Sequence, residues 1–523
     1  MSAFNDRISE RRRTFKNTGD GLDARRRRED EALQIRKREK EEQMSRRRKL
    51  VELSSDIPGN RICLNNVSIS TENIPKFAAC LNDQDPLVVA EATIALRKIL
   101  SVDRNPPIAE VLNAGVLPRL KELLADKTRP NIQLEACWAL TNIASGSPDQ
   151  TQAVVESGVV PLFVELLASC DSTLQEQAVW AVANIAGDRT EYRDGCISAG
   201  TAEALTHIVT SSIGTSLQMT RLAVWGLSNL CRGKPGPDFT RIKTAVPPLA
   251  RALAESNDTE VLADASWAFS YLTDSASHNH ILLVLDHLDL RRVAALLAHP
   301  SGTVHTPILR VVGNLVSGES DVTHRVVSTA NCLTQLKSLM LSNKKAIRKE
   351  TLWTISNICA DSQTLIQAVI DAGIMARLCE LVKSGNCDMD VKKEGIWCIC
   401  NSVTVGSKAQ IDSMVVDSRF DILSILSDFL ETARDTRSVR TALEAIYAVL
   451  LNDQGGTRYT SILEEVGGLT NIENLQQDES EEIYQACVRI LENFFHCDEQ
   501  QSSVEQKENI IFDFVARTSS LSG

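Results

Sequence analysis

Residues 174–188, LQEQAVWAVANIAGD, place a tryptophan, Trp180, and an asparagine, Asn184, four positions apart. Because residues four apart on an α-helix lie on the same face, we predict that these two side chains point the same way. The pair recurs along the chain, and we call the whole series the Trp/Asn ladder. Its other members are Trp138/Asn142, Trp225/Asn229, Trp353/Asn357 and Trp397/Asn401, with two related pairs, Trp267/Tyr271 and Arg310/Asn314, between them.

The ladder has a nearly constant period. Successive leading residues are 42, 45, 42, 43, 43 and 44 positions apart. Self-similarity at this period is typical of armadillo or HEAT-type helical solenoids, in which each repeat packs on its neighbours. The unit at 149–187 reads as three helices, with Gly158 where a sharp turn needs a residue that tolerates a positive φ. Gly115 and Gly373 take the same place in other units. Three helices per repeat favour the armadillo type.

The composition narrows the class of protein. Of 523 residues, 43% are hydrophobic and only 4% are aromatic, which is typical of a helical repeat protein. No run of 18 apolar residues and no apolar amino-terminal segment is present, so we expect a soluble intracellular protein that does not bind a membrane. The 14 cysteines include no Cys-x-x-Cys and sit mostly in apolar helical patterns. We expect no metal, no cofactor and no enzymatic activity.

The charge is divided unequally along the chain. Residues 1–50 hold 17 Lys/Arg and 10 Asp/Glu, a net charge of +7, and because the whole chain is −12, the remainder carries −19. The segment has few apolar residues to bury, so we predict a flexible basic arm that binds an acidic partner. We expect four regions: the arm at 1–52, a flexible linker at 53–72, a repeat domain at 73–495 and a polar tail at 496–523.

The ladder also carries a functional prediction. One alternative is that each Trp is core and each Asn satisfies a neighbouring backbone group. Indoles exposed in parallel would instead form slots, where a lysine or arginine stem packs on the rings and its charge meets the π face. An Asn offers a donor and an acceptor to an extended peptide backbone. We therefore predict a groove that binds an extended basic peptide in a first stretch, 138–225, and a second stretch, 310–397.

Four longer motifs point to a family: WALTNIASG (138–146), LQEQAVWAVANIAGD (174–188), VLADASWAFSYLTD (261–274) and KETLWTISNI (349–358). With them the chain resembles the importin-α family, the adaptors that recognise nuclear localisation signals, from the arm to about Phe495. The resemblance implies an all-α armadillo-repeat right-handed superhelical solenoid of about ten repeats. It also implies that the arm is an importin-β-binding domain, and that the two stretches form a major and a minor signal-binding groove.

The resemblance implies roles for individual residues. Asp188 should pair with the key lysine of the signal, with help from Thr151 and the carbonyl of Gly146. The other implied major-groove residues are Trp138, Asn142, Gln177, Trp180, Asn184, Trp225, Asn229 and Asp264. Those of the minor groove are Arg310, Asn314, Thr323, Glu350, Trp353, Asn357, Glu394, Trp397 and Asn401. The implied importin-β-binding and autoinhibitory residues of the arm are Arg11, Arg12, Arg13, Arg25, Arg26, Arg27, Arg28, Arg36, Lys37, Arg38, Lys40, Arg46, Arg47, Arg48 and Lys49.

The arm and the groove together predict a switch. The run Arg46-Arg47-Arg48-Lys49 resembles the ligand of the protein's own groove, so the arm should compete with cargo until importin-β binds it. The resemblance further implies shuttling between cytoplasm and nucleus, release by Ran-GTP and return on a nuclear export receptor.

Two other classes of protein remain open. A catenin-type armadillo scaffold would share the fold but needs neither the arm nor the ladder. A nucleic-acid binder would use the arm on phosphates, but the acidic remainder of the chain would repel them, so we expect no direct nucleic-acid ligand.

Overall fold

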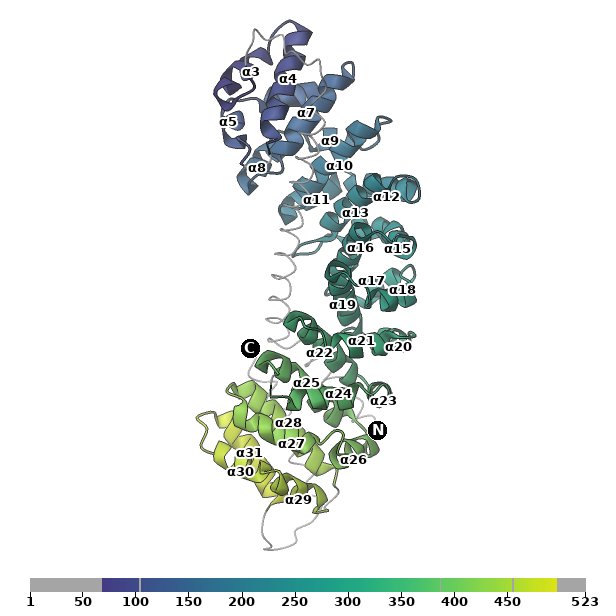
Figure 1. Ribbon diagram of the computed structural model, residues 1–523, viewed down its shortest axis with the longest axis vertical. Helices are drawn as coiled ribbons and strands as arrows, with labels where there is room; N and C mark the ends of the chain where they lie inside the picture. Colours follow the sequence, from purple (N-terminus) through teal and green to yellow (C-terminus); the bar gives the residue numbers. More distant parts are fainter. Residues whose placement is uncertain (1–67, 103–104, 386, 454–455, 496–523) are drawn as a thin grey trace. The chain divides into compact units, whose positions relative to one another are not determined.

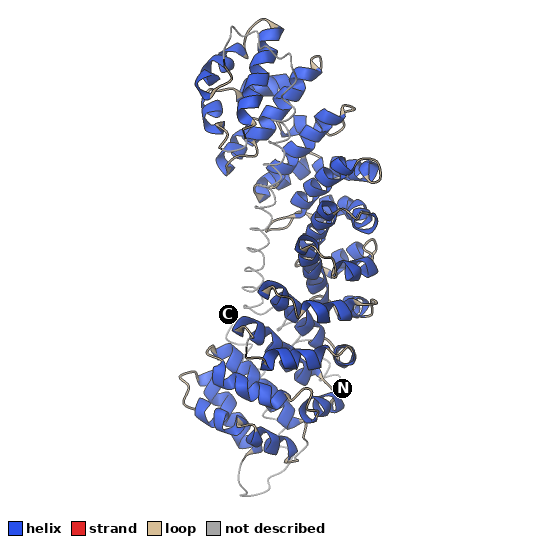
Figure 2. Cartoon of the chain, viewed as in Figure 1, coloured by secondary structure: helices blue, strands red, loops and turns tan. Residues whose placement is uncertain are grey.

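The computed structural model describes residues 68–102, 105–385, 387–453 and 456–495, and every regular element in those ranges is a helix (Figure 2). The arm, most of the linker and the tail lie outside the described residues, as do all the basic arm residues named above. None of the helices in the described part of the chain is both long and apolar enough to cross a membrane. The chain divides into two compact units, Met1–Arg377 and Leu378–Gly523, which we describe separately.

The helices of the first unit begin with η1 (Thr71–Asn73), α3 (Ile74–Cys80) and α4 (Pro86–Leu100). There follow α5 (Ile108–Asn113), α6 (Leu117–Ala125), α7 (Pro130–Ile143), α8 (Pro148–Glu156), α9 (Val160–Leu166), α10 (Ser172–Ala186), α11 (Thr190–Ser198), α12 (Thr201–Ser212) and α13 (Leu217–Cys231). The unit continues with α14 (Phe239–Ile242), η2 (Lys243–Ala245), α15 (Val246–Glu255), α16 (Thr259–Leu272), α17 (His278–Leu285), α18 (Leu290–Leu296) and α19 (Gly302–Val316). Its last helices are α20 (Ser320–Val327), α21 (Cys332–Leu339), α22 (Lys345–Cys359) and α23 (Gln363–Asp371), and α24 (Ile374–Lys383) leads into the second unit.

The second unit continues with α25 (Met389–Val405), α26 (Lys408–Val416), α27 (Ile422–Thr432) and α28 (Thr436–Leu451). It ends, among the described residues, with α29 (Arg458–Glu465), α30 (Gly468–Leu475) and α31 (Glu481–Phe494).

These helices fall into triples that repeat in chain order. Nine complete triples, from α5–α7 to α29–α31, follow a partial unit of α3 and α4 within the described ranges. In the first unit the third helix of each triple contacts the third helix of the next, so that α4, α7, α10, α13, α16, α19 and α22 form a row (Figure 1). In the second unit α25, α28 and α31 do the same. The predicted three-helix repeat is confirmed.

A residue with a positive φ separates the first two helices of most triples. The φ angles of Gly115, Gly158 and Gly373 are 71°, 74° and 66°, as predicted. At Gly115 an added Cβ would meet no atom within 4 Å, so it is the backbone conformation and not crowding that favours glycine there. Asn331, with a φ of 67°, and Asp421, with a φ of 45°, take this place in later triples, because their short polar side chains tolerate the left-handed region.

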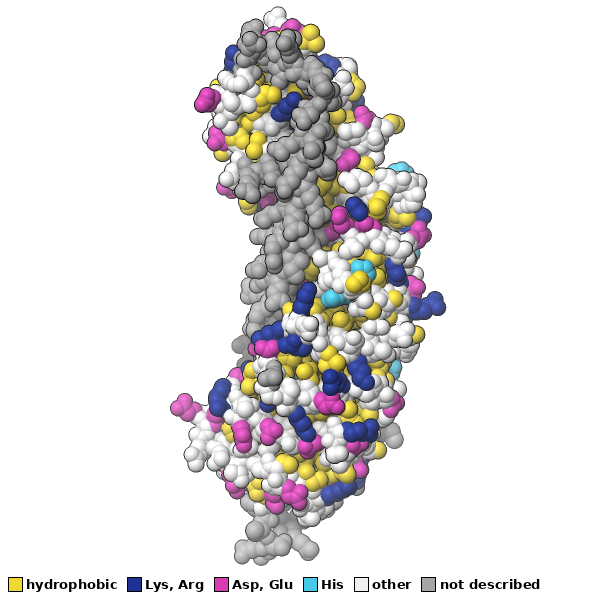
Figure 3. Space-filling view, viewed as in Figure 1, with side chains coloured by type: hydrophobic (Ala, Val, Ile, Leu, Met, Phe, Trp, Pro, Cys, Tyr) yellow, Lys and Arg dark blue, Asp and Glu magenta, His cyan; other side chains and the backbone are white. Residues whose placement is uncertain are grey.

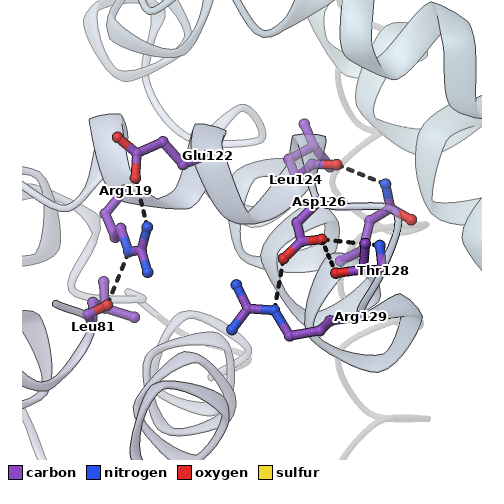
Figure 4. A network of polar contacts seen from close by, with 8 residues as sticks. Leu81, Arg119, Glu122, Leu124, Asp126, Thr128 and Arg129 are labelled. Atoms are coloured by element: carbon purple, nitrogen blue, oxygen red, sulfur yellow. Dashed lines mark hydrogen bonds and ion pairs between the residues drawn. The ribbon is translucent and has the colours of Figure 1, made fainter. Parts of the chain in front are cut away.

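Side-chain hydrogen bonds fix the turns between second and third helices. In the turn from α6 to α7, Asp126 accepts hydrogen bonds from the backbone N–H of Thr128 at 2.9 Å and from Arg129 Nε at 2.6 Å (Figure 4). The Thr128 hydroxyl and the Arg129 side chain lower the pKa of the Asp126 carboxyl to about 2. Arg119 Nε donates to the carbonyl of Leu81 at 3.0 Å, which ties the second repeat to the first.

Candidate functional site

The third helices position the ladder. The helix α10 begins where Asp171 accepts hydrogen bonds from the backbone N–H groups of Thr173 at 2.8 Å and Leu174 at 3.2 Å, which satisfies donors that the first turn cannot pair internally. It then places Trp180 and Asn184 one turn apart. Consecutive third helices of the first unit touch, and the Trp/Asn pairs occupy equivalent positions along these helices.

Trp180 and Trp225 differ from the expected parallel, exposed rings. They are 7% and 4% exposed, their ring centroids are 5.1 Å apart and their planes are inclined by 55°. Tilted aromatic pairs at this distance are in direct contact, which is favourable for rings from adjacent helices. A side chain inserted between two rings needs roughly 7 Å between them, two van der Waals contact distances. The rings would therefore have to separate before a cationic stem could enter between them.

An arginine lies over the first indole of the ladder. Arg97 Cζ, on α4, is 4.7 Å from the ring centroid of Trp138, and Arg97 Nε donates to Glu135 Oε2 at 2.7 Å. In the second unit, Arg437 Cζ is likewise 5.3 Å from the ring centroid of Trp397. Sequence reasoning missed both arginines. Two indoles of the ladder therefore contact guanidinium groups, and both groups are the protein's own.

Several ladder asparagines donate to the solenoid itself. Asn142 Nδ2 donates to Ser101 Oγ at 3.0 Å, and Asn229 Nδ2 donates to the carbonyl of Ala183 at 3.0 Å. Asn314 Nδ2 donates to the carbonyl of Ser270 at 3.0 Å. Each of these bonds reaches the end or the body of the preceding third helix. Asn357 Nδ2 instead donates to the carbonyl of Trp353 within its own helix, at 3.0 Å. Asn229, Asn314 and Asn357 thus each use one N–H on a backbone carbonyl, as in the alternative in which Asn serves the fold. Asn142 uses one N–H on a serine hydroxyl.

Asn184 behaves differently from the other ladder asparagines. Its side chain is 0% exposed, and within the described residues neither its Nδ2 nor its Oδ1 has a hydrogen-bond partner. Leaving a buried amide without partners costs about 1–3 kcal/mol for each polar group. Such a group is a candidate contact for the backbone of a bound peptide, because an amide can donate to a C=O and accept from an N–H.

The residues predicted to hold the key lysine lie just beyond the carboxyl ends of the third helices α7 and α10 and in the first helix α8. Asp188 follows α10 and pairs with Arg189 Nε at 3.3 Å. Thr151, in α8, is buried and donates to the carbonyl of Ala144 at 3.1 Å. Gly146 lies in the turn between α7 and α8, where an added Cβ would come within 2.0 Å of Gln150 Oε1, so a side chain cannot be accommodated without rearrangement. Of the other predicted contacts, Gln177 and Asp264 are buried on α10 and α16.

The second stretch is divided between the two units. Arg310 Nε and Glu350 Oε1 form an ion pair at 2.5 Å, with side chains 16% and 8% exposed, so the predicted acidic contact Glu350 already has a cation. Thr323, in α20, is buried and donates to the carbonyl of Val316 at 3.3 Å. Glu394, Trp397 and Asn401 lie on α25 in the second unit.

The acidic excess of the chain is not gathered into one field on the face that Figure 3 shows. Lys and Arg side chains are interspersed there with Asp and Glu over the described surface.

Comparison with known proteins agrees with this architecture. The chain matches the Importin beta binding domain family at residues 11–94, the Armadillo/beta-catenin-like repeat at 104–145, 147–187 and 323–360, and the Atypical Arm repeat at 457–509. An engineered protein of known crystal structure superimposes with a TM-score of 0.71 at 27% identity, covering 82% of this chain and 100% of its own. The predicted all-α armadillo fold is confirmed.

Relatives match over nearly the full length. Importin subunit alpha-4 of Arabidopsis thaliana is 39% identical, with 95% of this chain and 94% of the relative aligned. Importin subunit alpha-1a of Oryza sativa subsp. japonica is 38% identical, with 97% of each chain aligned. The chain therefore belongs to the importin subunit alpha family of nuclear import adaptors, and an importin-β-binding domain precedes its armadillo repeats.

Proposed function

We propose that this adaptor binds the lysine- and arginine-rich nuclear localisation signals of cargo proteins along its Trp/Asn ladder and presents them to importin-β through its arm. The observation that carries the proposal is the buried amide of Asn184, which has no partner among the described residues and lies one helical turn after Trp180 on α10. The cost of that amide is offset if the backbone of an extended peptide supplies the missing donor and acceptor.

Signal binding in the first stretch would proceed by exchange. The tilted rings of Trp180 and Trp225 separate, and a lysine or arginine stem replaces their mutual contact. Each such cation–π contact contributes about 0.5–2 kcal/mol. The carboxylate of Asp188 then exchanges Arg189, whose side chain is 38% exposed, for the ammonium of the signal. At 3.3 Å and with its arginine 38% exposed, this pair contributes little to stability, so the exchange costs little.

The arm would regulate the ladder. A basic run tethered by a flexible linker has an effective concentration on the order of 1 mM at its own binding site. If the arm binds with a Kd of about 100 μM, cargo affinity is lowered about tenfold until importin-β takes the arm away. Loading of the carrier and loading of cargo are then coupled.

We propose that the protein moves with importin-β from the cytoplasm into the nucleus, where Ran-GTP releases it. A nuclear export receptor then returns it to the cytoplasm. The ladder would act as a peptide-binding surface throughout, with no catalytic step and no direct contact to nucleic acid or membrane.

Calorimetry of two proteins tests the proposal. The full chain and a variant without residues 1–50 are each titrated with one lysine-rich signal peptide and with duplex DNA. We expect about tenfold tighter peptide binding by the shortened chain and no DNA binding by either. Peptide binding that is the same in both proteins would exclude regulation by the arm. A DNA affinity that is lost with the arm would favour the nucleic-acid binder instead.

A second experiment tests the site itself. Asp188→Lys should lower the affinity for the signal peptide at least tenfold, because it places a cation where the ammonium should bind. The matched control is Asp371→Lys, which makes the same charge change at an exposed residue of the same unit. Full peptide affinity in the Asp188 variant would exclude the ladder's first stretch as the signal-binding site.

A further inference from the structure

A pattern in the first stretch recurs in the second. The first stretch has Asn142, then Gly146 four residues later, then Thr151 after five more. The second has Asn314, Gly318 and Thr323 at the same spacing. In each case the next ladder asparagine is followed four residues later by an aspartate. These pairs are Asn184/Asp188 and Asn357/Asp361, in the motifs NIAGD and NICAD.

The turns that lead into α8 and α20 contain equivalent hydrogen bonds from their threonines. Thr151 Oγ1 donates to the carbonyls of Ala144 and Ser147, seven and four residues earlier, at 3.1 and 3.3 Å. Thr323 Oγ1 donates to the carbonyls seven and four residues earlier in the second stretch, those of Val316 and Glu319, at 3.3 and 3.2 Å. The two threonine hydroxyls are therefore held in equivalent positions.

The two aspartates also end their helices in the same way. The N–H of Asp188 donates to the carbonyl of Ile185 at 3.2 Å, and the N–H of Asp361 donates to the carbonyl of Ile358, also at 3.2 Å. Each aspartate is thus the first residue beyond the last turn of a third helix that follows the threonine-bearing turn. The two aspartates therefore occupy equivalent backbone positions in their repeats.

One difference fixes the second carboxylate more firmly. Ser320 stands where the first stretch has Pro148, and Ser320 Oγ donates to Asp361 Oδ1 at 2.7 Å. Ser320 is the first residue of α20 and lies one turn before Thr323, so this bond holds the Asp361 carboxylate beside the threonine-bearing turn. Asp361 is only 2% exposed.

We propose that Asp361, together with Thr323 and the carbonyl of Gly318, is a second lysine- or arginine-selecting subsite, built like that of Asp188, Thr151 and Gly146. Asp361 is the specificity-determining group and Ser320 is its positioning residue. A cation at such a site gains a charge-assisted hydrogen bond in a largely desolvated position, where one is stronger than at the surface. The assignment rests on the proposed function and adds to it a residue that carries the charge selection of the second stretch.

The test uses the full chain in complex with importin-β and a synthetic peptide. The peptide carries a Lys-Arg pair and a Lys-Lys-Lys-Arg-Lys cluster joined by a flexible Gly/Ser linker, and binding is followed by fluorescence anisotropy. The pair's lysine and arginine are each replaced in turn by norleucine, which keeps the stem and removes the charge. The protein variants are Asp361→Asn, Ser320→Ala and, as a control of equal charge change at an exposed residue, Asp371→Asn.

Asp361→Asn should lower the affinity for this peptide about tenfold, and one norleucine replacement should cost about the same. The two changes together should cost no more than either alone, which a purely structural role of Asp361 would not produce. Asp371→Asn should have no effect, and Asp361→Asn should not change the binding of the five-residue cluster alone. Ser320→Ala keeps the charge and should reduce the norleucine penalty to about threefold.

Additive losses, or full affinity of the Asp361→Asn variant for the two-cluster peptide, would overturn the assignment. Should Asp361→Asn fail to fold, an unchanged norleucine penalty in Ser320→Ala would overturn it equally. Failure of the proposed function is recognised separately, because Asp188→Asn would then leave the affinity for both peptides unchanged.

Discussion

Arg97 lies over the indole of Trp138, with its Cζ 4.7 Å from the ring centroid, and is held there by Glu135. The ring that is predicted to open the signal-binding ladder thus has an internal cation on one face. We propose that the basic side chains of a bound signal make the same kind of contact with the other indoles of the ladder. It also means that Arg97 and an incoming basic peptide would compete for the ring face of Trp138.

Replacing Arg97 by methionine tests that competition. The variant keeps an apolar stem but removes a positive charge beside the ladder, so we expect about threefold tighter binding of a lysine-rich peptide at low salt. The loss of the cation–π contact should lower the stability by about 0.5–2 kcal/mol. Anisotropy titrations and urea unfolding measure the two effects. Weaker peptide binding at unchanged stability would instead make the Arg97 guanidinium part of the binding surface.

Asn184 and Asn229 should respond in opposite ways to the same substitution. In Asn184→Leu an amide without partners among the described residues is replaced by an apolar group of similar size, so stability should be unchanged or slightly higher. In Asn229→Leu the carbonyl of Ala183 loses a donor, and stability should fall by about 1–3 kcal/mol.

Peptide affinity separates the two roles further. Asn184→Leu should weaken signal binding about tenfold despite its unchanged stability. Urea unfolding and calorimetry of both variants supply the comparison. A destabilised Asn184→Leu protein with normal peptide affinity would show that this amide serves the fold alone.

The ion pair of Arg310 and Glu350 should show strong coupling in a double-mutant cycle. Arg310→Leu removes the cation from a carboxylate that is only 8% exposed, and we expect a loss of about 3–5 kcal/mol. The double variant Arg310→Leu/Glu350→Leu should recover most of that stability, because neither charge is then buried. Free energies of unfolding from urea titrations test this. Additive losses in the double variant would show that the pair contributes no coupling energy.

Asp126 gives the α6–α7 turn a defined response to acid. Its pKa is lowered to about 2 by Thr128 and Arg129, whereas its ordinary value is 3.8. Its contribution to stability is therefore fully present above about pH 4 and is lost as the pH falls through 2. Asp126→Asn should be less stable than the parent at pH 7 but should lose less between pH 4 and 2. Urea unfolding of both proteins at pH 7, 4 and 2 measures these free energies. Equal losses of stability in the two proteins between pH 4 and 2 would contradict the prediction.

The cysteines should fall into two classes of reactivity. Cys170 is exposed, whereas burial raises the pKa of the Cys231 thiol from 9.0 to about 12. At pH 8 iodoacetamide should alkylate Cys170 in the native protein and Cys231 only after unfolding, because the thiolate is the reactive form. The stabilising effect of the Cys231 thiol is present below pH 9 and is lost between 9 and 12. Site-resolved mass spectrometry checks the order, and equal labelling rates would contradict it.

The sequence predicted the features that depend on the repeat period. Period and turn residues located the triples and the positive φ angles of Gly115 and Gly158, because both depend on short-range geometry. Contacts between repeats were harder to foresee. The tilt of Trp180 against Trp225 depends on how two third helices pack, and periodicity specifies only that they are neighbours. Asp361 was also missed, although comparison of NICAD with NIAGD would have found it.

Hydrogen bonds donated by the side-chain amides of Asn142, Asn229 and Asn314 connect α7 to the end of α4, α13 to α10 and α19 to α16. The intervening ladder positions are taken by Asn184, Tyr271 and Asn357, and within the described residues the amides of Asn184 and Asn357 make no such tie. Asparagine ties between third helices are thus found at alternate junctions, whereas α19 and α22 are joined by the ion pair of Arg310 and Glu350. Successive junctions of the row are therefore held by different polar contacts, and under a mechanical load they should open at different forces and not as a uniform spring.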